Sequence, residues 1–113
     1  MYKRFRKFDV RFSVCNGRLV RGVTAADGRA YAHRCTREIY AAVAEAMQSV
    51  GEEGATVDSL ATGLNLPHAQ VNVAVEFLKA RGLLETHRRR NFPMSEAVLE
   101  DATAEFAALG QTS

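Results

Sequence analysis

Residues 56–84 read TVDSLATGLNLPHAQVNVAVEFLKARGLL, and this stretch decides the fold. Thr56 is a good N-cap for a short helix over about 57–63, which Gly63 is expected to end. Pro67 suits the start of a longer helix, because its missing N–H costs nothing there. This second helix runs to about Arg81, and its buried stripe recurs at helical spacing: Val71, Ala74, Val75 and Leu78. The pattern predicts two helices joined by a tight turn.

Two further helices are predicted on either side of this stretch. Thr36 caps a helix that ends near Gly51, with an apolar stripe of Ile39, Val43, Ala46, Met47 and Val50. After residue 82, an extended pattern over 83–86 is followed by a polar tip, HRRRN, at 87–91. Pro93 breaks the returning strand. Ser95 is then expected to cap a last helix with a stripe of Val98, Leu99, Ala102, Phe106 and Leu109.

The N-terminal third has the pattern of a small antiparallel sheet. Apolar and polar residues alternate over 7–15, which is the period of a half-buried strand. Asn16-Gly17 is a strong signal for a two-residue hairpin turn. That turn pairs Val14 with Leu19 and Val10 with Val23, and it also pairs Phe12 with Arg21, a charged residue on an apolar face. Asp27-Gly28 allows a second turn into 29–34, so a β-meander is predicted.

Residues 36–93 resemble the winged helix-turn-helix superfamily, especially bacterial regulators of the multiple-antibiotic-resistance type. The resemblance rests on 56–61 (TVDSLA), 64–67 (LNLP), 71–78 (VNVAVEFL) and 79–84 (KARGLL). It implies an α+β winged helix-turn-helix fold with an N-terminal β-hairpin or meander (1–35) and a C-terminal helix and tail (94–113), together one domain over 1–113. It also implies a transcriptional regulator that binds double-stranded DNA.

In such a domain, the N-terminal half of the helix after Pro67 enters the major groove. The residues expected on its outward face are His68, Ala69, Gln70, Asn72, Val73, Glu76 and Ala80. Gln70 and Asn72 have the chemistry to read adenine edges, and Ala69 and Val73 are suited to thymine methyl groups. The backbone amides that begin at Thr56 are placed to hold a phosphate. At the strand tip, Arg88, Arg89 and Arg90 are expected to lie along phosphates or in a minor groove.

One departure from the family pattern supports a second hypothesis. The expected reading helix has no Lys or Arg in its first three turns, where the usual regulator has an Arg near the position of Val73, and Glu76 tends to repel DNA. Some winged helices bind proteins instead, and an outward strip from Ala69 to Val73 would suit a protein-interaction module without sequence-specific DNA binding.

The composition is that of an ordinary globular chain, with 47% hydrophobic and 25% charged residues among 113. The net charge of +2 is unevenly spread: residues 1–40 hold ten Lys and Arg against three acids, and residues 41–113 hold five against ten. The basic, aromatic segment 2–7 (YKRFRK) suits stacking on bases, or else an edge strand guarded by charge.

The sequence offers no enzyme motif, neither a Gly-rich phosphate loop nor a His-Glu-x-x-His pair, so no catalysis and no cofactor are predicted. Cys15, His33, Cys35 and His87 are metal-ligand types, but their spacing matches no zinc pattern, so no metal is expected. No apolar run approaches the ~18–20 residues that span a bilayer, and no signal peptide is recognisable. We therefore expect a cytoplasmic protein with reduced cysteines.

The apolar stripes of the first and last helices predict a homodimer through these terminal helices. Together they supply more apolar surface than so small a core is expected to need: Ile39, Tyr40, Val43 and Met47, with Val98, Leu99, Phe106 and Leu109. A symmetric dimer would present two reading helices about one DNA turn apart.

Overall fold

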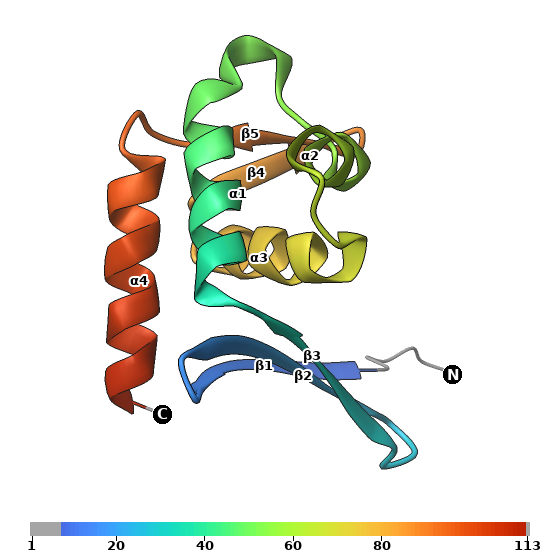
Figure 1. Cartoon of the computed structure of the whole chain (residues 1–113). Coiled ribbons are helices and arrows are strands. Elements are labelled where there is room, and N and C mark those ends of the chain that lie inside the picture. The colour runs from blue at the N-terminus through green and yellow to red at the C-terminus, as the bar shows by residue number, and fades with distance from the viewer. Residues whose placement is uncertain (1–7, 113) are drawn as a thin grey trace.

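A computed structural model describes residues 8–112 and shows an α+β fold (Figure 1). A three-stranded antiparallel sheet, the meander, comes first, with strand order β1-β2-β3. Its strands are β1 (Phe8–Cys15), β2 (Arg18–Ala25) and β3 (Ala30–Cys35). The remaining elements, in chain order, are α1 (Arg37–Ser49), a 3₁₀ turn η1 (Gly51–Glu53), α2 (Val57–Leu64), α3 (His68–Ala80), β4 (Leu84–His87), β5 (Arg90–Pro93) and α4 (Val98–Thr112).

The predicted register of the first hairpin is confirmed. Val14 lies opposite Leu19, and Phe12 lies opposite Arg21. Asn16 and Gly17 both have positive φ, 53° and 76°, which the two-residue turn requires. Since directly opposite residues share a face of a sheet, the paired Phe12 and Arg21 belong to the same face as the buried Leu19.

Helix α3 lies between the meander and the rest of the fold (Figure 1). On one side, the ring of Phe77 meets that of Phe12 edge-on, with centroids 5.2 Å apart. On the other, α3 packs against α1, α2 and β4. Phe77, Val71, Ala74, Val75 and Leu78 are each 0–1% exposed, so the four residues predicted for its buried stripe are confirmed.

Helices α1 and α4 lie side by side within the chain (Figure 1). The hydroxyl of Tyr40 on α1 donates a 2.7 Å hydrogen bond to the carbonyl oxygen of Ala102 on α4. Burial, and secondarily the charge of Glu105, raises the pKa of Tyr40 well above its ordinary value. Most of the apolar side chains predicted for the two stripes are buried in the folded chain, and Ile39, Leu99 and Phe106 are partly buried.

The ends of two helices differ from the sequence predictions. Gly63 does not end α2: the helix continues through Leu64, and Asn65 adopts the left-handed conformation (φ 56°) and donates its N–H to the carbonyls of Ala61 and Thr62. Asn tolerates this conformation, so it replaces the expected glycine. Ser95 lies too early to cap α4, and its hydroxyl instead accepts a hydrogen bond from the N–H of Ala97, just before the helix begins.

The loop before α2 is tied to the hairpin formed by β4 and β5. Ala55 and Asn91 exchange backbone hydrogen bonds of 2.9 and 2.7 Å, and the side-chain amide of Asn91 also donates to the carbonyl of Ala55. Asn91 is 3% exposed, and its amide oxygen accepts a 2.7 Å bond from Thr86. Both the oxygen and the nitrogen of the Asn91 side-chain amide are therefore hydrogen-bonded. These bonds hold the start of α2 beside β5.

In the described part of the chain, no helix combines the length and the hydropathy that a membrane crossing requires.

Candidate nucleic-acid interface

One narrow side of α3 remains accessible between its two packed sides. This exposed stripe consists of His68, Ala69, Asn72, Glu76, Lys79 and Ala80, which are exposed or half-buried and recur every three or four residues. It contains three of the predicted DNA contacts, His68, Ala69 and Asn72.

The prediction that Val73 faces outward was wrong. Its side chain is 1% exposed, and Phe77, one helical turn further along the same side, packs on Phe12 of the meander. The meander therefore covers a side of α3 that the sequence assigned to solvent. The exposed apolar strip from Ala69 to Val73 proposed for a protein partner is reduced to Ala69.

Gln70 also has a different role from the predicted one. Its side-chain oxygen accepts a 3.0 Å hydrogen bond from the backbone N–H of Thr36, the residue that caps α1. The side-chain hydroxyl of Thr36 in turn accepts from the N–H of Ile39. Gln70 thus joins the start of α3 to the start of α1, and the structure does not present it for reading bases.

The hairpin tip holds two arginines in an uncommon backbone conformation. His87 and Arg90 are the last ladder pair, so Arg88 and Arg89 form a two-residue turn. Both have positive φ, 51° and 73°. Such turns strongly prefer Asn-Gly, because the Cβ atom of an L-residue is crowded at positive φ, which glycine avoids and asparagine tolerates. This chain uses Asn16-Gly17 at its other two-residue turn, yet it has two arginines here.

The third predicted arginine is partly engaged within the fold. The guanidinium of Arg90 donates a 3.2 Å hydrogen bond to the backbone carbonyl of Glu53 in η1. It therefore also ties the start of β5 to η1, whereas Arg88 and Arg89 form the turn itself.

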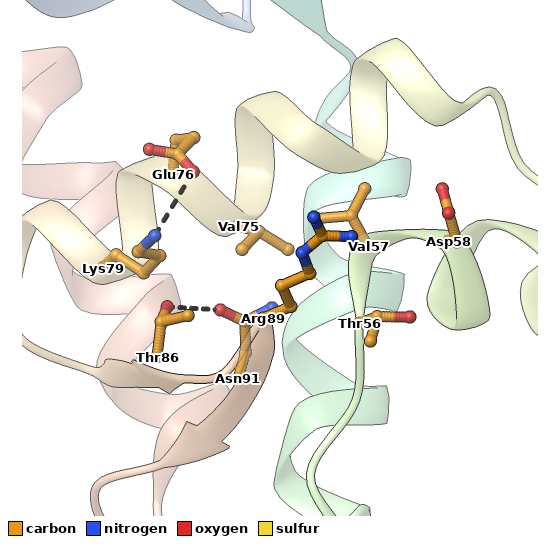
Figure 2. A pocket seen from close by; sticks show the side chains of 9 residues that line it. All are labelled: Thr56, Val57, Asp58, Val75, Glu76, Lys79, Thr86, Arg89 and Asn91. Carbon is orange, nitrogen blue, oxygen red and sulfur yellow. Dashed lines mark hydrogen bonds and ion pairs between the residues drawn. The ribbon is translucent and has the colours of Figure 1, made fainter.

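Arg89 overhangs a shallow hollow of about 360 Å³ between α2, α3 and the hairpin (Figure 2). Its side chain extends from the hairpin toward Val57 at the start of α2. The other walls are formed by Thr56, Asp58, Val75, Glu76, Lys79, Thr86 and Asn91. Lys79 lies 3.5 Å from Glu76, so one cation and one carboxylate share the α3 wall. The hollow gathers two of the predicted contacts, Thr56 and Arg89, at one place.

The start of α2 is closed by a capping box. The hydroxyl of Thr56 accepts from the N–H of Ser59 at 2.9 Å, and the hydroxyl of Ser59 accepts from the N–H of Thr56 at 3.0 Å. The predicted phosphate donors are therefore narrowed to the amides of Val57 and Asp58. Asp58 also lies 2.7 Å from His68, and this pair links the starts of α2 and α3 at the surface.

Two residues of this surface were missed by the sequence analysis. The first is Lys79, which could have been predicted from helical spacing, because it lies three residues after Glu76 on the same side of α3. Arg21 lies on the other side of the Glu76–Lys79 pair, in a second hollow with Val10, Phe12 and Ala80. Its unusual pairing with Phe12 was the available signal. The Nε of Arg21 is buried and has no hydrogen-bond partner in the part of the chain that the structure describes.

The residues considered for metal or redox chemistry do not form a site. Cys15 is opposite Arg18, and Cys35 is opposite Leu19, so alternation along β2 directs the two thiols to opposite faces of the meander. Both cysteines are free, and burial raises the pKa of the Cys35 thiol to about 12. Within residues 8–111, no group of three or more His, Cys, Asp or Glu side chains is arranged to hold a metal ion. The basic segment 2–7 lies outside the described residues.

Compared with protein-family models, curated proteins and solved structures, the chain matches none of them.

Proposed function

We propose that this protein is a winged-helix protein that binds duplex DNA and acts as a small transcriptional regulator. In this reading, α2 and α3 form the helix-turn-helix, β4 and β5 form the wing, and the Ala55–Asn91 bridge is the short strand that completes the wing sheet. The order of elements and the bridge support this assignment.

The observation that carries the proposal is the turn at Arg88 and Arg89. Two L-residues with long side chains in the left-handed region cost roughly 1–2 kcal/mol each relative to the conformation they prefer. A turn that only closed the hairpin would avoid this cost with Asn-Gly, as at 16–17. Backbone strain at an exposed tip that carries two guanidiniums is therefore explained by what those guanidiniums bind. Phosphate is the partner that suits them best.

The exposed stripe of α3 supports only a limited role for this helix in reading the DNA sequence. Val73 and Gln70 are withdrawn from the set of base contacts, which leaves Asn72, Ala69 and His68 on the stripe. Glu76 beside Lys79 reduces the positive charge of α3. We infer that phosphate contacts from the wing supply most of the affinity and that Asn72 supplies most of the base discrimination.

The protein-interaction alternative depended on an outward Val73. Because that side chain is buried, no specific observation now favours this alternative.

The test replaces the strained turn with the sequence that the chain uses elsewhere. In the variant Arg88→Asn/Arg89→Gly, glycine removes the positive-φ cost at position 89 and asparagine lowers it at position 88. The free energy of unfolding from urea melts is therefore expected to rise by at least roughly 1–2 kcal/mol. The same variant loses two cations from the wing. Fluorescence anisotropy with duplex DNA across a salt series is expected to show weaker binding, and a slope of log K against log[salt] that is smaller by up to about 1.8.

A matched control removes two arginines elsewhere, at Arg11 and Arg29, which lie on the meander and form ion pairs with Asp9 and Asp27. The Arg11→Ala/Arg29→Ala variant has the same net charge as the turn variant, so its salt slope should stay near that of the wild type. If both variants lose affinity and salt slope equally, DNA binding depends on net charge and not on the turn, which would contradict the proposal. An unchanged slope in the turn variant, or no DNA binding by the wild type at low salt, would contradict the proposal.

A further inference from the structure

The outer edge of β3 is an unpaired strand edge. β3 is the last strand of the meander, and among the described residues no strand pairs with its outer side. Residues 30–34 are all exposed. Proteins usually protect such edges with charged residues, proline or a bulge, because free N–H and C=O groups recruit other strands. The opposite edge strand, β1, carries Asp9 and Arg11 and is contacted by α4. Among its strand residues, Ala30–Cys35, β3 carries a single Lys or Arg, Arg34, and no carboxylate.

The pairing of β2 and β3 determines which backbone groups of β3 are free. Ala25 donates its N–H to the carbonyl of Arg29 at 2.8 Å, and these two residues continue the β2–β3 register. Hydrogen-bonded and non-hydrogen-bonded pairs alternate along an antiparallel ladder. Tyr31 and His33 therefore direct their backbone groups toward β2, whereas Ala30, Ala32 and Arg34 direct theirs to the open edge.

We propose that a second copy of this chain pairs with this edge, β3 against β3 in antiparallel orientation, about a twofold axis at Ala32. In this register Ala32 lies opposite Ala32 of the second copy, and Ala30 lies opposite Arg34. Each of the three outward-directed residues then exchanges both its N–H and its C=O with the second strand, so every free backbone group of the edge is paired.

The side chains suit this register. The small side chains of Ala30 and Ala32 lie on the outer face, so they do not obstruct the approach of the two strands, and Arg34 never meets Arg34. On the inner face, Tyr31 lies opposite His33 of the second copy. These two rings already meet edge-on within one chain, with centroids 5.2 Å apart, and Tyr31 is 51% exposed. Aromatic pairs directly across an antiparallel ladder are stabilising.

This route differs from the dimer predicted from the terminal helices. The apolar stripes of α1 and α4 are largely buried within one chain, while no strand among residues 8–112 pairs with the outer backbone groups of β3. A second copy at β3 would join two meanders into one continuous sheet. Since the twofold axis is perpendicular to that sheet, both copies of α3 would lie on the same side of it.

The oligomeric state without DNA tests the inference, independently of the proposed function. Sedimentation velocity of the full chain is expected to show a dimer that dissociates on dilution. Ala32→Pro removes an N–H that points away from β2, so it leaves the β2–β3 ladder intact and is expected to yield a monomer. Ala32→Lys places two like charges directly opposite each other and should weaken the dimer several-fold. The control Thr24→Lys adds the same charge on the same face, on β2, and should leave the dimer unchanged.

Amide hydrogen exchange by NMR tests the register in the wild-type protein. It therefore still tests the proposal if a variant fails to fold. In the wild type, the amides of Ala30, Ala32 and Arg34 should exchange more slowly as protein concentration rises. Those of Tyr31 and His33, already bonded to β2, should not change. A wild-type monomer at NMR concentrations would overturn the inference. So would a dimer that persists in folded Ala32→Pro and Ala32→Lys, or protection that is independent of concentration.

Discussion

The burial of Val73 makes a quantitative prediction that separates the stability of α3 from its recognition role. Val73→Ala removes two methyl groups from a side chain that is 1% exposed. At about 0.8 kcal/mol per buried methylene-sized group, the lost burial alone costs about 1.6 kcal/mol. A cavity remains where α3 meets its neighbours, which raises the expected loss to about 2–3 kcal/mol. For a chain of this size, the melting temperature should fall by roughly 10 °C.

Asn72→Ala, at the neighbouring position on the exposed stripe, is the matched variant. Alanine favours helix, and no hydrogen bond of the Asn72 side chain within the described residues is lost, so stability should change by no more than about 0.5 kcal/mol. If Asn72 reads a base, affinity for the preferred duplex should fall by about 1–3 kcal/mol, roughly 5- to 150-fold.

Thermal melts followed by circular dichroism, with DNA anisotropy well below the melting temperature, distinguish the two residues. Val73→Ala should melt early yet bind DNA like the wild type while folded, and Asn72→Ala should do the reverse. The reasoning is refuted if Val73→Ala keeps the wild-type melting temperature and loses DNA affinity, because Val73 would then face the ligand.

Three other perturbations have definite expected results. Gly54→Ala forces an L-residue to φ 66° and places its Cβ 2.6 Å from Cε1 of Phe92, so urea melts should show a loss of about 2–4 kcal/mol. Gln70→Ala should cost about 1 kcal/mol by the same assay, through the lost hydrogen bond from the Thr36 N–H, without altering base preference in competition binding. The Cys35 thiol has its pKa raised from 9.0 to about 12 in the folded state, so the stability it contributes is present below pH 9 and is lost as pH rises toward 12. Urea melts at about pH 8 and 10.5 should show a smaller decline for Cys35→Ala, and thiol labelling of the native wild type should modify Cys15 but not Cys35.

Local sequence patterns predicted the elements of this fold because their signals are short-range. Asn16-Gly17 determined the turn and hence the register of β1 and β2, and the spacing of Val71, Ala74 and Leu78 determined one buried side of α3. Helix ends were predicted less well. Asn65 ends α2 in the left-handed conformation, and a glycine two residues earlier was the more obvious signal.

The candidate site was harder to predict, because it depends on which elements pack on α3. A periodic pattern shows that Val73 is apolar, but not that a sheet from the N-terminal third covers it. Gln70 reaches Thr36 across 34 positions in the sequence, a contact that no local pattern contains. Arg21 gave a detectable signal, since a charged residue opposite Phe12 conflicts with an apolar face. Its place beside Lys79 requires the packing of the meander on α3.

The two packed sides of α3 also limit how this protein is able to change over evolutionary time. Substitutions at Val73 or Phe77 disturb the core and lower the stability of the fold without placing a new side chain on the surface. Substitutions at the stripe positions, such as Ala69 and Asn72, and at the hairpin turn leave the core intact and change only the accessible surface. New recognition properties would therefore arise by exchange of a few accessible residues on an unchanged helix.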